Sequence, residues 1–158
     1  MKTLTEQLDF YAECHTNVII RMTHYIGVPC IIIAIMMLFN WVSLDIASLW
    51  KISFTWLVLL LVIIYYLILN IRLGLLAAAT LILLTFLATL FSGPTPTKTT
   101  FTIFCILFAG GWVCQFIGHL FEKKQPAFFK SLSQLLIGPL FFLVALLRAF
   151  KLKKYFLP

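Results

Sequence analysis

Long stretches without a charged residue limit the structures open to this sequence more than any other feature. They cover residues 22–44, 52–71, 73–97 and 99–121, with a shorter one at 131–147. A helix that crosses a bilayer needs about 20 mainly apolar residues, and the first four stretches are long enough. Only 11% of the residues are charged, whereas soluble domains carry about 25%. We therefore predict an all-α, polytopic integral membrane protein that forms one helical bundle over residues 1–158.

Breaks between these stretches divide the chain into predicted helices. We expect membrane spans at about residues 24–44, 52–70, 73–92 and 100–120. The segment at 131–147 is short for a span and contains Gly138-Pro139, so it predicts either a re-entrant segment or a fifth helix. Residues 3–20 predict an amphipathic helix on the membrane surface, because apolar and ring side chains recur every three or four positions along one face. These positions are Leu4, Leu8, Tyr11, His15 and Val18.

The excess of basic residues indicates membrane lipids, and not nucleic acid, as the partner. The net charge is +7, but the basic residues flank apolar spans and do not form one soluble patch. With four spans and a cytoplasmic N-terminus, ten of the twelve Lys and Arg residues lie on the cytoplasmic side, as the positive-inside rule requires. We therefore expect a cytoplasmic N-terminus in a bacterial inner membrane or an endoplasmic reticulum membrane.

The three histidines of the chain converge on the cytoplasmic membrane face in this topology. His24 opens the first predicted span, His119 ends the fourth, and His15 lies on the N-terminal helix beside the same surface. His15 and His24 are nine residues apart, which places them on opposite sides of a continuous helix. They can share a site only if the chain bends between them, so we expect the N-terminal helix to end within residues 16–23. An unbroken helix through both histidines is the alternative.

The helix face around His119 carries further polar residues. Trp112, Gln115, His119 and Glu122 are spaced by three, four and three residues, which places them on one side of a helix. Gln115 can orient the imidazole of His119, and Glu122 can serve as a metal ligand or as a partner of one. Polar groups cost free energy in lipid unless they have partners, so we expect this face to point into the bundle.

Imidazoles together with a carboxylate suit a metal ion. Such ligands hold non-haem Fe(II), which binds dioxygen at open coordination positions, and three histidines with a water molecule also hold catalytic zinc. A third interpretation is that these residues only cap the ends of spans. A site at the membrane surface can take a lipid whose head lies at the interface, and Arg21 and Lys123 are candidates to bind an acidic head group.

Three blocks of the sequence resemble a known family of membrane proteins. They are FYAECHTNVIIRMTHYIGVP at residues 10–29, GWVCQFIGHLFEKKQPAFF at 111–129 and LSQLLIGPLFFL at 132–143. In order and separation they are similar to the 2-hydroxy-fatty-acid dioxygenases of phytosphingosine breakdown. The resemblance implies Fe(II) held by His15, His24 and His119, with O2 and a 2-hydroxy fatty acid as substrates. It also implies a product fatty acid that is one carbon shorter.

On this interpretation the histidines and Glu122 are the catalytic residues, while Asn17 and Gln115 orient ligands or water. Three residues are candidates to bind the carboxylate of the substrate: Tyr11, Arg21 and Lys123. Two alternatives stay open. One is a lipid-binding membrane protein that keeps the fold without catalysis, and the other is a zinc-dependent lipid hydrolase.

Overall fold

The computed structural model describes residues 4–13, 15, 17–46, 50–122, 133–152 and 156, and most of them are helical. The helices are α1 (Leu4–Glu13), α2 (Val18–Asn40), α3 (Phe54–Leu69), α4 (Ile71–Ser92), α5 (Lys98–Glu122) and α6 (Ser133–Ala149). Two short strands, β1 (Ser43–Ile46) and β2 (Trp50–Ser53), pair antiparallel between α2 and α3. The predicted helical bundle is thus confirmed, with a small hairpin where we expected no strands.

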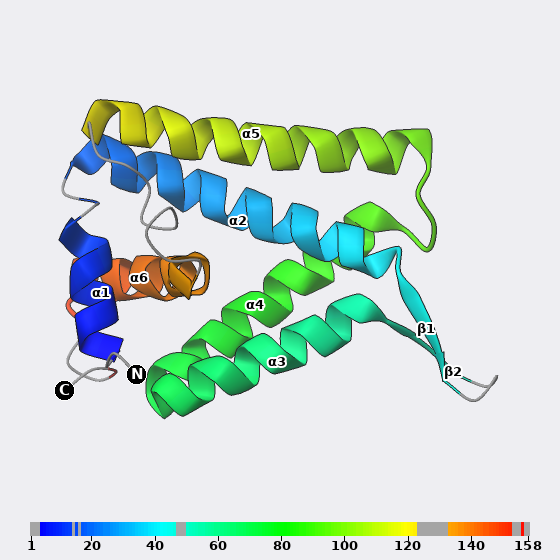
Figure 1. Ribbon diagram of the computed structural model, residues 1–158, viewed down its shortest axis with the longest axis horizontal. Helices are drawn as coiled ribbons and strands as arrows, with labels where there is room; N and C mark the ends of the chain where they lie inside the picture. Colours follow the sequence, from blue (N-terminus) through cyan, green and yellow to red (C-terminus); the bar gives the residue numbers. More distant parts are fainter. Residues whose placement is uncertain are drawn as a thin grey trace.

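The helices pack as two pairs with a cap at one end (Figure 1). α2 and α5 lie side by side over most of their length, and α3 and α4 form a second pair that crosses them obliquely. α4 also contacts α2, so the two pairs share a core. α1 and α6 pack against each other at the end where α2 begins and α5 ends. Two additional helices therefore cover this end of the bundle.

Among the described residues, three helices are long and apolar enough to cross a membrane: α2, α4 and α5. α3 has 16 residues and rises about 24 Å, which is less than the roughly 30 Å of a hydrocarbon core. It is shorter than the predicted span at 52–70 because residues 50–53 pair as β2. The described residues therefore contain three helices of full spanning length where we expected four.

Two helices differ from their predicted bounds for clear physical reasons. α2 begins at Val18, earlier than the span predicted at 24–44, because the side chain of Asn17 caps its first turn. Arg21 is exposed in this turn, from which a long cationic side chain can reach the head groups. α6 has 17 residues and continues through Pro139 as one helix. The fifth-helix alternative therefore describes this segment, which contains no reversal of the chain.

Glycines let α2 and α5 approach each other closely. A Cβ atom added to Gly27 would lie 2.8 Å from a backbone oxygen of α5, and one added to Gly118 would overlap the hydroxyl of Thr23. Small residues at such contacts let helix backbones pack within a membrane. Gly118 and Thr23 directly precede His119 and His24, so this contact brings two of the histidines to the same level of the bundle.

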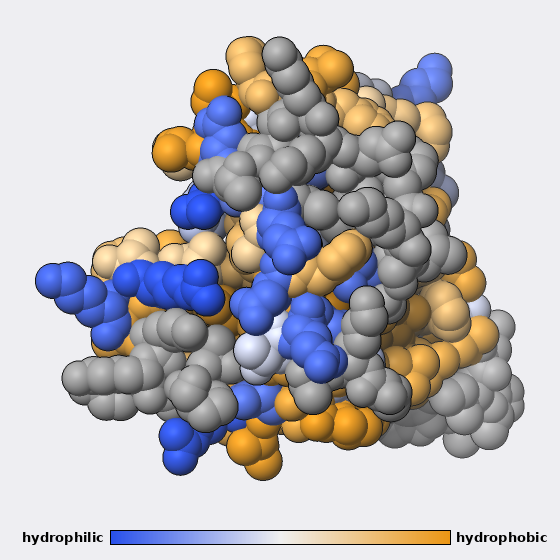
Figure 2. All heavy atoms as spheres, turned by 60° about the vertical axis from the view of Figure 1, so that its left-hand side comes forward, coloured by the Kyte–Doolittle hydropathy of each residue, from blue (hydrophilic) through white to orange (hydrophobic). Residues whose placement is uncertain are grey.

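The end of the bundle that α1 and α6 cover carries polar side chains. Figure 2 turns this end forward and shows hydrophilic side chains gathered on it, with apolar side chains beside them. The exposed charged residues of α1 and of the first turn of α2 are Glu6, Asp9, Glu13 and Arg21. Such an arrangement fits helices that enter the bilayer from this end.

Candidate metal centre

A break between α1 and α2 lets His15 and His24 face each other. α1 ends at Glu13, and the side chain of Asn17 caps α2 by accepting a hydrogen bond from a backbone N–H of its first turn (3.0 Å). Arg21 donates from Nε to the backbone carbonyl of His15 (3.1 Å), which ties the link to α2. The predicted bend is confirmed. However, the amphipathic helix ends at Glu13 and not near residue 20, because Asn17 starts a new helix.

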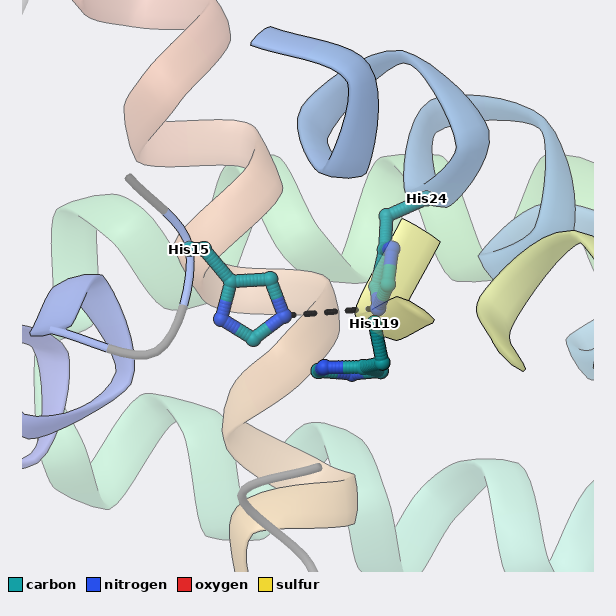
Figure 3. Close-up of side chains that lie close together, drawn as sticks. All are labelled: His15, His24 and His119. Carbon is teal, nitrogen blue, oxygen red and sulfur yellow. Dashed lines mark hydrogen bonds between the residues drawn. The ribbon is translucent and has the colours of Figure 1, made fainter. Parts of the chain in front are cut away.

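Three histidines converge below this link, one from the link itself, one from α2 and one from α5 (Figure 3). Their candidate ligand nitrogens all lie within 4.8 Å of one another. The Nε2 atoms of His15 and His24 are 3.3 Å apart, and the ring centroid of His119 lies 5.2 Å from His15 and 5.0 Å from His24. The three ring planes meet at 74° to 85°, so the rings meet at their edges and do not stack.

All three imidazoles are buried, with exposed fractions of 1% for His15, 2% for His24 and 7% for His119. Nδ1 of His15 lies 2.8 Å from the backbone carbonyl of Tyr11, and because a carbonyl only accepts, this nitrogen carries a proton. The lone pair of a neutral His15 is therefore on Nε2, the atom nearest His24. Metal-binding histidines commonly have this arrangement, in which one nitrogen donates to a backbone oxygen and the other binds the metal.

Aromatic rings from α1 and α6 enclose the histidines. Tyr11 stacks on His15 with ring centroids 4.2 Å apart and planes at 6°. Phe142 stacks on His24 at 5.4 Å and 29°, and Phe141 lies 5.7 Å from His15. These rings restrict the orientation of the imidazoles and exclude water from two sides of the cluster.

The donor set fits a divalent transition metal. A bond from such a metal to an imidazole nitrogen is about 2.1 Å long, so two ligands of one ion lie at most roughly 4.2 Å apart. Small rotations of the rings bring the three nitrogens into this range. The cluster contains no acid among the described side chains, and burial without a counter-charge favours the neutral imidazoles that bind metals. Three ligands leave coordination positions open for other molecules.

Two of the histidines, His24 and His119, line the polar end of a long apolar cavity of about 370 Å³. One side of α2 lines it from His24 through Val28 and Ile35 to Phe39, a distance of about 22 Å along the helix. Residues of α3, α5 and α6 complete the walls, together with Tyr11 of α1 and Leu81 of α4. Small-molecule sites typically have this volume and a few polar groups in an apolar lining. A second apolar cavity, of about 220 Å³, reaches His24 from the side of α4 and α6.

The other predicted site residues take three different positions. Tyr11 and Gln115 line the cavity beside the histidines, so the polar face of α5 points inward. Asn17 and Arg21 shape the link between α1 and α2 through the hydrogen bonds given above. Nε2 of Gln115 has no partner among the described residues, so this atom does not donate to His119.

Two further predicted residues lie at or beyond the end of α5. Glu122 is the last residue of the helix. Its side chain and the whole of Lys123 lie outside the part of the chain that the structure describes.

Gln134 and Phe142 are site residues that our sequence analysis did not single out. Both belong to α6, and Gln134 lines the large cavity with only 5% of its surface exposed. Its Oε1 atom has no hydrogen-bond partner among the described groups. The signal that could have identified Gln134 is its position as an amide in the apolar stretch at 131–147, because a polar group in lipid needs a partner or a function.

Comparison with known proteins gives a consistent result. A family model described as "2-hydroxy-palmitic acid dioxygenase Mpo1-like" matches residues 1–150. The 2-hydroxy-palmitic acid dioxygenase MPO1 of Saccharomyces cerevisiae is 35% identical over 140 residues, which cover 87% of this chain and 76% of the yeast protein. No solved structure matches the chain. The stretch matched by the family model contains all three clustered histidines.

Proposed function

Because the chain belongs to the family described as 2-hydroxy-palmitic acid dioxygenase Mpo1-like, we propose that it is an Fe(II)-dependent dioxygenase of 2-hydroxy fatty acids. The observation that carries this proposal is a cluster of three buried histidines, two of which, His24 and His119, line the polar end of an apolar cavity. The histidines supply metal ligands, and the cavity supplies space for an acyl chain. A fatty acid has the same division into a polar head and an apolar tail.

The cavity is suited to the acyl chain in its length and in its lining. It extends along about 22 Å of α2, where Val28, Ile32 and Ile35 form part of its wall. A substrate that comes from the bilayer gains little free energy when its chain enters the cavity, because both surroundings are apolar. The cavity therefore positions the acyl chain and selects its length, while contacts with the head group supply most of the specificity.

Fe(II), when bound, supplies the activation of O2 that side chains cannot provide. The chain's own residues hold and shield the reacting groups. Tyr11 keeps the proton of His15 on Nδ1 through its backbone carbonyl, so Nε2 stays available as a ligand. The rings of Tyr11 and Phe142 pack on the imidazoles and limit the access of water. A dry site of this kind protects a reactive centre from side reactions.

The proposed reaction balances without an external reductant. One 2-hydroxy acid and one O2 give a fatty acid shorter by one carbon, carbon dioxide and water. The bond between C1 and C2 of the substrate breaks, C2 becomes the new carboxyl carbon, and C1 leaves as carbon dioxide. All electrons released by these two carbons reduce the O2.

The remaining polar residues keep the roles expected from the sequence as part of this proposal. Tyr11, which lines the cavity, and Arg21, which is exposed in the first turn of α2, are candidates to guide the carboxylate into the site. Lys123 is a third candidate, and Glu122 is a candidate ligand. Asn17 acts indirectly, because it caps the helix that carries His24.

Oxygen uptake by the purified protein tests the proposal. Protein loaded with Fe(II) under anaerobic conditions should consume O2 when 2-hydroxypalmitate and air are added, and should release the fatty acid with one carbon fewer. Palmitate, which lacks the 2-hydroxyl group, is the control substrate, and His24→Ala is the control variant. Neither control should support uptake.

Two other outcomes would replace the proposal. Binding of 2-hydroxypalmitate without O2 uptake by the Fe(II)-loaded protein would indicate a lipid-binding protein that keeps the fold. Zinc as the bound metal, together with hydrolysis of a lipid and no requirement for O2, would indicate a hydrolase.

A further inference from the structure

Two buried glutamines line the same cavity as His24 and His119. Gln115 comes from α5 and Gln134 from α6, with exposed fractions of 7% and 5%. Nε2 of Gln115 is a hydrogen-bond donor and Oε1 of Gln134 is an acceptor, and neither has a partner among the described residues. Buried polar atoms are rarely left without a partner in native proteins. The two atoms therefore point to a ligand that completes them.

The chemistry of these two atoms matches the head of a 2-hydroxy acid. An ionised carboxylate only accepts hydrogen bonds, so it suits the amide N–H of Gln115. A hydroxyl group donates a hydrogen bond, so it suits the carbonyl oxygen of Gln134. An ionised fatty acid without the 2-hydroxyl group has no donor. It would therefore leave Oε1 of Gln134 buried and without a partner.

We propose that Gln134 recognises the 2-hydroxyl group of the substrate while Gln115 binds its carboxylate. The identity of the substrate in this inference rests on the proposed function above. Gln134 is then the residue that distinguishes 2-hydroxy fatty acids from unsubstituted fatty acids of the same chain length. The apolar cavity cannot make this distinction, since both acids present the same tail to it.

Contacts of α6 hold Gln134 in place beside the cavity. The hydroxyl of Tyr66 donates a hydrogen bond to the backbone carbonyl of Leu136 (2.6 Å), one turn of helix or less from Gln134. Gly138 lies against the side chain of Tyr11, because a Cβ atom added there would be 3.0 Å from the Tyr11 hydroxyl. The first turns of α6 are thus fixed to α3 and to α1, and this fixed position is what a selective contact requires.

Competition binding without O2 tests this inference separately from catalysis. A fluorescent fatty acid bound to the purified full-length protein is displaced by 2-hydroxypalmitate or by palmitate, and the ratio of the two affinities is measured. The wild-type protein should prefer the 2-hydroxy acid by roughly 10- to 100-fold, because the other acid leaves a buried acceptor unpaired. Gln134→Leu should reduce this ratio to about one by weakening the binding of the 2-hydroxy acid alone. Gln115→Leu should weaken both acids and preserve the ratio.

Two controls separate recognition from a general loss of structure. The hydroxyl of Thr85 is also buried without a partner among the described residues, but Thr85 lines neither of the two cavities, so Thr85→Val should keep the wild-type ratio. 2-Methoxypalmitate cannot donate to Gln134 and should lose the advantage of the 2-hydroxy acid on the unchanged protein. The inference is overturned by an unaltered ratio in Gln134→Leu, or by equal affinity for the methoxy and hydroxy acids.

The result can be distinguished from the outcome of the oxygen-uptake test. A preference that depends on Gln134 would stand even if the protein consumed no O2, and only the dioxygenase proposal would then fail. Normal O2 uptake together with a ratio that Gln134→Leu leaves unchanged would overturn only the role of Gln134.

Discussion

Replacement of Gly27 by alanine should push α2 and α5 apart next to the metal centre. A Cβ atom at this position would lie 2.8 Å from the carbonyl oxygen of Gly111, 2.8 Å from Nε2 of Gln115 and 3.1 Å from Cβ of Cys114. The amide of Gln115 can rotate away, but the carbonyl belongs to the backbone of α5. An ordinary contact needs at least 3.4 Å, so the two helices must separate by about 0.6 Å.

The cost of this separation can be isolated with a matched glycine on α5. A Cβ atom added to Gly110 has no atom within 4 Å, so Gly110→Ala introduces no clash. Both substitutions gain a similar helix propensity of about 1 kcal/mol, which cancels when the two variants are compared. Overpacking costs about 1–3 kcal/mol. The free energy of unfolding of Gly27→Ala should therefore be lower than that of Gly110→Ala by about this amount.

Unfolding in mixed detergent micelles measures the stability difference, and a titration with Fe(II) under anaerobic conditions measures the effect on the site. Gly27 lies one turn after His24, so the Gly27→Ala variant should also bind Fe(II) more weakly than Gly110→Ala does. Equal unfolding free energies for the two variants would refute the close approach of α2 and α5 at this point. A loss of stability without any change in Fe(II) affinity would refute its link to the metal centre.

Three further changes test other parts of the account. Ile35→Trp should fill the far part of the large cavity and shift binding toward shorter 2-hydroxy acids, whereas Ile82→Trp, at a residue that is 48% exposed, should leave the chain-length profile unaltered. Tyr66→Phe should lower the free energy of unfolding by about 0.5–1.5 kcal/mol, because a hydrogen bond between α3 and α6 is lost; an unchanged unfolding midpoint would contradict this. In a background without native cysteines, Thr95→Cys in the loop between α4 and α5 should react with an impermeant maleimide only from the non-cytoplasmic side, and labelling from the cytoplasm would reverse the predicted orientation.

The sequence predicts the meeting of the histidines because topology alone brings them to one membrane face. Uncharged stretches locate the spans, and the number of spans then places His24 and His119 at the same end of the bundle. The nine-residue separation from His15 further requires a bend, which the structure contains. The position of the bend is set by a single capping side chain, Asn17, and helical periodicity does not reveal which of several polar residues will cap.

Contacts that depend on three-dimensional packing were not predictable in the same way. The cover over the site comes from α6, and its contacts with α1 and α2 join segments more than a hundred residues apart. The stacking of Phe142 on His24 leaves no pattern along the chain. An amide in an apolar stretch marks Gln134 as unusual, but it does not reveal that the side chain lines this cavity. The β hairpin was missed because strands of four residues are too short to give a clear alternation.

The metal content of the purified protein shows whether the three clustered histidines bind iron. Wild-type protein and His119→Ala are loaded with Fe(II) without O2, freed of unbound metal and analysed for iron and zinc. We predict about one iron per wild-type chain, since three imidazoles form a single site, and almost none in His119→Ala. Equal iron in both proteins, zinc in place of iron, or no bound metal in the wild-type protein would contradict it.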